Sequence, residues 1–150
     1  MKNVEELKTI LETEADLAHA LLAEVTHEQE AIIKLQGQGV AATVSAQQEL
    51  LKPLENLEVE RTRCIQSIGG ELKNPALGKS PTVKELVKVL PATDGEQIAA
   101  AAEQLRSVVE RIVTTNVRNK VLLDRSRRFV DETLRIVTED HTRKIIDQRM

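Results

Sequence analysis

Aromatic residues are almost absent from this sequence: Phe129 is the only one among 150 residues, and there is no Trp or Tyr. Proteins that bind bases by stacking, and ligand pockets lined by aromatic rings, need such side chains. Their scarcity argues against both kinds of site. A core of Leu, Ile, Val and Ala instead suits the packing of helix on helix.

Cysteine is equally rare. Cys64 is the only cysteine, so no disulfide can form within the chain, and the sequence does not read as a disulfide-stapled secreted domain. There is no run of about 18 apolar residues that would span a membrane. The segment after Met1 lacks the apolar region of a signal peptide. We therefore expect a soluble, cytoplasmic protein without membrane insertion.

The charge balance excludes two further classes. Hydrophobic residues make up 41% of the chain and charged residues 30%, with a net charge of −3. Disordered chains combine low hydrophobicity with high net charge, and nucleic-acid-binding domains carry a basic excess. The basic run at 125–128 is flanked by Asp124, Asp131 and Glu132, and ion pairs at helical spacing explain it. We expect a folded domain with no nucleic-acid partner.

Apolar residues recur in alternating steps of three and four along three long segments, a pattern typical of helices packed along their length. This pattern predicts helices at about 4–35, 41–68 and 94–138. The run 36–39 contains two glycines that should end the first helix, so the second should return antiparallel. Thr82 and Glu85 have capping-box spacing and predict a short helix at about 82–90.

The predicted fold class is therefore all-α: an elongated antiparallel helical bundle, or coiled coil, of three long helices plus one short helix. No segment shows the alternation of a strand. We expect residues 1–138 to form a single helical-bundle domain. For the tail at 139–150 two alternatives stay open, a continuation of the last helix or a mobile segment.

Two asparagines, Asn116 and Asn119, lie on the predicted apolar seam of the last long helix. A buried Asn without a partner costs about 1–3 kcal/mol, so the pair needs an explanation. One interpretation is a structural polar layer that fixes register or oligomeric state. The other is a face that binds another chain. The whole seam reads Ile98, Ala102, Leu105, Val109, Ile112, Asn116, Asn119, Leu123, Ser126, Val130, Leu134 or Thr133, and Val137.

No catalytic or metal-binding pattern is complete. Glu24 and His27 have the Glu-x-x-His spacing of di-iron helical bundles, but such a site needs this motif on two helices and a Glu from each of two others. His19 and His27 lack the His-x-x-Lys-Gly motif of phosphotransfer domains. Cys64 has no histidine near it in sequence. We predict no enzyme activity, no metal site and no cofactor.

The segment Asn116-Val117-Arg118-Asn119-Lys120-Val121-Leu122-Leu123 resembles the N-x-x-N-x-x-L-L segment of FlgN-type flagellar export chaperones. Further parts of that family's pattern occur in order. The run at 54–61 is similar to its Leu/Glu run, Gly69-Gly70 follows, and Thr82-x-x-Glu85-Leu86 opens the short helix. The resemblance covers about residues 5–138.

This resemblance implies a cytoplasmic type III export chaperone. Such proteins bind the C-terminal helical segments of flagellar hook–filament junction proteins, prevent premature assembly and deliver them to the export apparatus. The resemblance places binding in the C-terminal part of the chain and leaves a homodimer open. The alternative is a structural coiled-coil or homo-oligomeric interaction protein without an export client. The predicted partner-binding residues are Asn116, Asn119, Leu122, Leu123, Val130, Leu134, Val137, Ile145 and Ile146.

Overall fold

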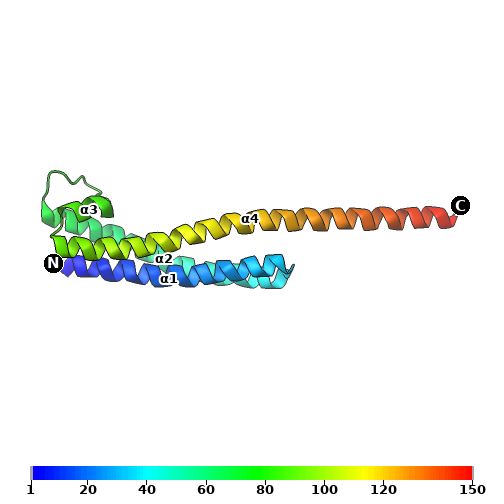
Figure 1. Ribbon diagram of the computed structural model, residues 1–150, viewed down its shortest axis with the longest axis horizontal. Helices are drawn as coiled ribbons and strands as arrows, with labels where there is room; N and C mark the ends of the chain where they lie inside the picture. Colours follow the sequence, from blue (N-terminus) through cyan, green and yellow to red (C-terminus); the bar gives the residue numbers. More distant parts are fainter. Residues whose placement is uncertain (1, 150) are drawn as a thin grey trace.

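The computed structural model describes residues 2–149, and their side chains from 2 to 139. It contains four helices: α1 (Lys2–Ile33), α2 (Gly37–Leu72), α3 (Val83–Val89) and α4 (Ala92–Arg149). Strands are absent from this part of the chain, which confirms the all-α fold class. In Figure 1, α1 and α2 form an antiparallel hairpin beside the first half of α4, and α3 lies at the end where α4 begins.

Helix α1 is the centre of the packing. It contacts both α2 and α4 along its length, whereas the backbones of α2 and α4 do not approach each other closely over the described residues. Leu7 on α1, Ile68 on α2, Leu86 on α3 and Ile98 on α4 have no exposed surface and belong to one core cluster. A second cluster, farther along, joins Val25 to α4. The hydrophobic effect at these contacts holds the bundle together.

The residue that caps the end of α1 in the left-handed conformation is a leucine and not a glycine. The Gln36 N–H donates to the Ala31 carbonyl at 2.9 Å, and the Leu35 N–H donates to the Ile32 carbonyl at 3.1 Å. These two bonds make a Schellman motif, in which Leu35 occupies the left-handed position with φ of 55°. Gly37 already belongs to α2. The expectation that the glycines of 36–39 end the first helix is therefore wrong.

The short helix α3 begins as the sequence predicts. The Thr82 hydroxyl oxygen accepts a hydrogen bond from the Glu85 N–H at 3.1 Å, and the two side chains are also bonded. This satisfies one of the N–H groups that a helix start leaves without a partner. The helix then lies against the start of α4, where Gly95 allows the Val87 carbonyl to come close.

Helices α2 and α4 are longer than the periodicity alone indicates. Helix α2 includes Pro53 and reaches Leu72, and α4 continues to Arg149, so the segment from Glu139 is helical. Figure 1 shows that the second half of α4 extends well past the hairpin. We call residues 127–149 of α4 the arm.

Candidate functional site

Three adjacent columns of residues run along α4, each repeating every seven residues, which is two turns of a packed helix. The central column is Ile98, Leu105, Ile112, Asn119 and Ser126. The inner column is Ala101, Val108, Thr115, Leu122, Phe129 and Ile136. The outer column is Ala102, Val109, Asn116, Leu123, Val130 and Val137.

The hairpin covers the central and inner columns along the first part of α4, up to about residue 122. Ile98, Ala101, Val108 and Ile112 are all buried, whereas in the outer column Val109 is 43% exposed. The sequence predicted a seam of central and outer residues. That prediction is correct for the central column and for Ala102, which packs partly against the core, and wrong for the outer column from Val109 onward. The central column gives steps of three and four when it is combined with either the inner or the outer column. Periodicity alone therefore could not show which of these two neighbouring columns is buried.

Asn119 lies in the central column and is buried, with 3% of its surface exposed. Its Nδ2 donates a hydrogen bond of 2.9 Å to the carbonyl of Val25 in α1. Its Oδ1 is also buried and has no partner within the described part of the chain. The amide therefore joins α4 to α1 at one defined register, and leaves one acceptor unsatisfied.

Asn116 has a different environment. It lies in the outer column between Val109 and Leu123, and its side chain is exposed. The two asparagines therefore do not form one polar layer, contrary to the first interpretation of the sequence. The Asn116 amide is open to another chain, and the Asn119 amide is not.

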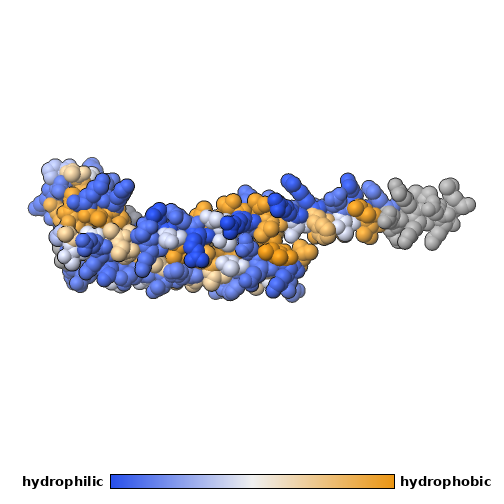
Figure 2. All heavy atoms as spheres, in the orientation of Figure 1, coloured by the Kyte–Doolittle hydropathy of each residue, from blue (hydrophilic) through white to orange (hydrophobic). Residues whose placement is uncertain are grey.

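The arm projects without cover as far as its side chains are described, to residue 139. All side chains described between 127 and 139 are exposed. They include large apolar groups: Phe129 is 61% exposed, Leu134 60%, Ile136 49% and Val137 58%. Figure 2 shows apolar surface at the hairpin tip and apolar patches among polar atoms on the coloured part of the arm. Large apolar side chains exposed together on one segment mark a candidate site of interaction in soluble proteins.

The structure places the predicted site residues in three settings. Leu123, Val130, Leu134 and Val137 are exposed with Asn116 on the uncovered side of α4. Leu122 is half-buried beside the end of the hairpin. Ile145 and Ile146 lie outside the residues whose side chains the structure describes. Phe129 and Ile136, which the sequence-based prediction missed, extend the inner column along the arm.

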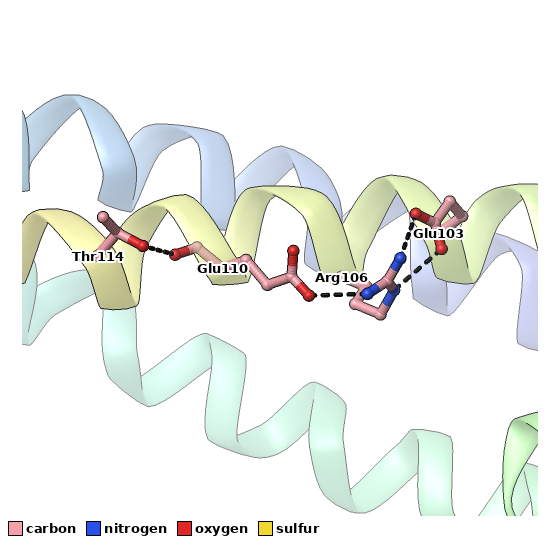
Figure 3. A network of polar contacts seen from close by, with 4 residues as sticks. All are labelled: Glu103, Arg106, Glu110 and Thr114. Atoms are coloured by element: carbon pink, nitrogen blue, oxygen red, sulfur yellow. Dashed lines mark hydrogen bonds and ion pairs between the residues drawn. The ribbon is translucent and has the colours of Figure 1, made fainter.

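A polar network occupies another face of α4 (Figure 3). The Arg106 guanidinium contacts both Glu103 oxygens, at 2.6 and 2.9 Å, and Glu110 Oε1 at 2.7 Å. The hydrogen bond from Arg106 holds the pKa of Glu103 below its usual range. Thr114 donates to the Glu110 carbonyl. Because all four residues lie three or four apart on one exposed helix, the network stabilises α4 locally and forms no site.

The residues considered for chemistry are not assembled into a site. Glu24 and His27 are 3.9 Å apart on α1, and no group of three candidate metal ligands occurs among the described side chains. Cys64 is buried, and its Sγ donates to the Asn3 carbonyl at 3.2 Å. Burial raises the pKa of the Cys64 thiol, and Glu6 and Glu71 raise it further, which disfavours the reactive thiolate.

Over the residues that the structure describes, no helix combines the length and the apolar character needed to cross a bilayer.

Comparison with known protein families gives one match. The model of the FlgN protein family matches residues 1–146. Comparisons with curated proteins and with solved structures gave no significant match. Because the family match covers nearly the whole chain, this protein belongs to the FlgN family, and that membership supports a general role as a flagellar export chaperone.

Proposed function

We propose that this protein is a cytoplasmic chaperone of flagellar type III export whose clients are hook–filament junction proteins. It covers their C-terminal helical segments, prevents premature assembly and delivers them to the export apparatus. Family membership supports the general role. The observation that carries the finer proposal is the uncovered apolar surface of the arm.

The arm is suited to bind an amphipathic helix. Most helical stability in proteins comes from packing of an apolar face against a neighbour, and the described side chains of the arm have no such neighbour. A client helix laid along the arm would bury apolar surface on both partners, the mode of recognition known as helix-in-groove. In this proposal the client contacts Leu123, Val130, Leu134 and Val137, with Ile145 and Ile146 farther along.

The two asparagines have separate roles in this proposal. Asn116 is exposed next to Leu123, so its amide can bond a polar group of the client. Asn119 is bonded to α1, so it supports the site by fixing α4 against the hairpin. Leu122 lies between these two settings, at the edge of the surface that the hairpin covers.

Isothermal titration calorimetry of the full-length protein with a C-terminal peptide of a junction protein tests the proposal. The Val130→Ser/Val137→Ser variant removes two valines of the outer column, which are 45% and 58% exposed. We expect at least about tenfold weaker binding, because burying two valines contributes about 2 kcal/mol or more. Circular dichroism should show unchanged helix content, since neither side chain is buried in the bundle.

A matched control is available on the same helix. Val117 and Val121 are 60% and 45% exposed but lie in columns that are otherwise mainly polar. Val117→Ser/Val121→Ser should therefore bind the peptide like the unaltered protein. If the two double variants bind equally well, the arm is not the client site.

The same arm variant also tests the alternative of a homo-oligomer without a client. Two arms could cover each other in a homodimer. Sedimentation velocity would then show a dimer that Val130→Ser/Val137→Ser dissociates, while the unaltered protein would bind no peptide. We expect the opposite pattern, with peptide binding by the unaltered protein.

A further inference from the structure

The tip of the α1–α2 hairpin exposes two large aliphatic side chains. Ile33 is 64% exposed and Leu35 is 58% exposed. Both line a depression between the tip and α4, where Leu122, Arg125 and Phe129 form the opposite wall. The depression lies where the covered part of α4 meets the arm.

Leu35 is an unfavourable residue for the fold itself. Its φ of 55° places it in the left-handed region, which costs a residue with a side chain about 1–2 kcal/mol relative to the usual conformation. Glycine adopts that conformation readily and is the common residue at this position of a Schellman motif. The leucine also gains little from burial here. Nothing in the packing of the hairpin accounts for a leucine at position 35.

The surface that α1 covers on α4 continues past the end of α1. The inner column is buried at Ala101 and Val108 and half-buried at Leu122, and it is exposed at Phe129 and Ile136. The next large residues of the same column thus lack the neighbour that α1 provides earlier. A helix placed in line with α1, with one end against the hairpin tip, would extend the existing α1–α4 interface.

We propose that the hairpin tip is the seat for one end of the client helix. That helix lies in line with α1, covers Phe129 and Ile136 beside Val130 and Val137, and inserts a large aliphatic or aromatic side chain between Leu35 and Phe129. The occupant is an amphipathic helix of the export client. This inference rests on the proposed function and extends its site from α4 to the hairpin.

The variant Leu35→Gly tests the inference because its effects on folding and on binding have opposite directions. Glycine removes the strain at φ 55°, so the melting temperature should stay the same or rise. Affinity for the junction-protein peptide should fall about tenfold, since one large apolar anchor is lost. The control Val59→Ser removes an apolar side chain of 59% exposure on α2 and should leave affinity unchanged.

Ile33→Ser is a second variant of the hairpin tip, and we expect it to bind the junction-protein peptide more weakly too. The outcomes separate the two proposals. If Val130→Ser/Val137→Ser weakens binding but both tip variants bind like the unaltered protein, the tip inference is overturned and the proposed function stands. If neither the arm variant nor the tip variants weaken binding, both are overturned.

Discussion

A carboxylate is buried in the interface between α1 and α2. Glu14 is only 4% exposed, and its Oε2 accepts a 2.6 Å bond from Arg61 of α2, whereas its Oε1 has no partner among the described residues. Burial raises the pKa of Glu14 above 4.5, Arg61 opposes this rise, and Glu58 adds to it. The folded protein therefore binds a proton at Glu14 more tightly than the unfolded chain does.

The raised pKa of Glu14 determines the direction in which the stability of the protein changes with pH. The stability that Glu14 contributes is fully present below its unfolded pKa and is lost as pH rises through the raised folded pKa. Arg61→Met removes the opposing charge and should deepen this loss. We expect Arg61→Met to lower the free energy of unfolding by about 3 kcal/mol near pH 7.5 and by clearly less near pH 4.5.

Urea denaturation at the two pH values measures the effect of Arg61→Met. Arg63→Met serves as the control, because Arg63 is exposed on the same helix and its loss should change stability by less than about 0.5 kcal/mol. An equal loss of stability at both pH values for Arg61→Met would contradict the assignment of the effect to Glu14.

The two asparagines should respond differently to the same substitution. Asn119→Leu gives up one hydrogen bond, but it removes a buried unsatisfied oxygen and adds apolar surface to the core. We expect a net gain in stability of about 1 kcal/mol. Asn116→Leu alters an exposed position and should change stability by less than about 0.5 kcal/mol. Chemical denaturation of both variants measures the two changes in the free energy of unfolding. Equal gains in stability would mean that the two residues share one environment.

At the scale of single elements, the contact between α3 and α4 depends on a glycine. A Cβ built at Gly95 would lie 3.0 Å from the Val87 carbonyl oxygen, which is closer than Cβ atoms normally approach backbone. This carbonyl cannot move without shifting α3. Because position 95 has no side chain, α3 can pack closely against α4.

Gly95→Ala should therefore destabilise the protein although alanine favours helix. We expect a loss of about 1 kcal/mol from overpacking. The control is Gly70→Ala in the last turns of α2, where a new Cβ meets nothing within 4 Å. That change should add about 0.5–1 kcal/mol. Thermal denaturation of both variants tests the pair, and a gain in stability for Gly95→Ala would disprove the close contact.

The existence and type of each helix could be predicted from the sequence because apolar periodicity and the cap at Thr82 are local signals. The choice between neighbouring columns on α4 could not, since Val108 and Val109 satisfy the same spacing and only tertiary packing separates them. The left-handed leucine that caps α1 was not predicted, because the nearby glycines offered a stronger signal. Glu14 gave no signal, because its partner lies on another helix.

At the scale of the whole molecule, unequal helix lengths create the candidate site. Helix α4 has 58 residues and α1 has 32, so roughly 40 Å of α4 extends beyond its main neighbour. The bundle holds the first half of α4 in place, and the arm presents apolar surface that the chain itself does not cover over the residues described to 139. In the proposed function, the first half of α4 contributes to folding and the arm of the same helix contributes to client binding.

Hydrogen exchange along α4, with and without the junction-protein peptide, tests this division most directly. In the free protein, amides at 127–139 should exchange much faster than those at 98–112, because only the latter lie in the packed bundle. Saturating peptide should slow exchange at 127–139 by about tenfold or more and leave 98–112 unchanged. Protection confined to the bundle, with exchange at 127–139 unaltered by bound peptide, would contradict the account.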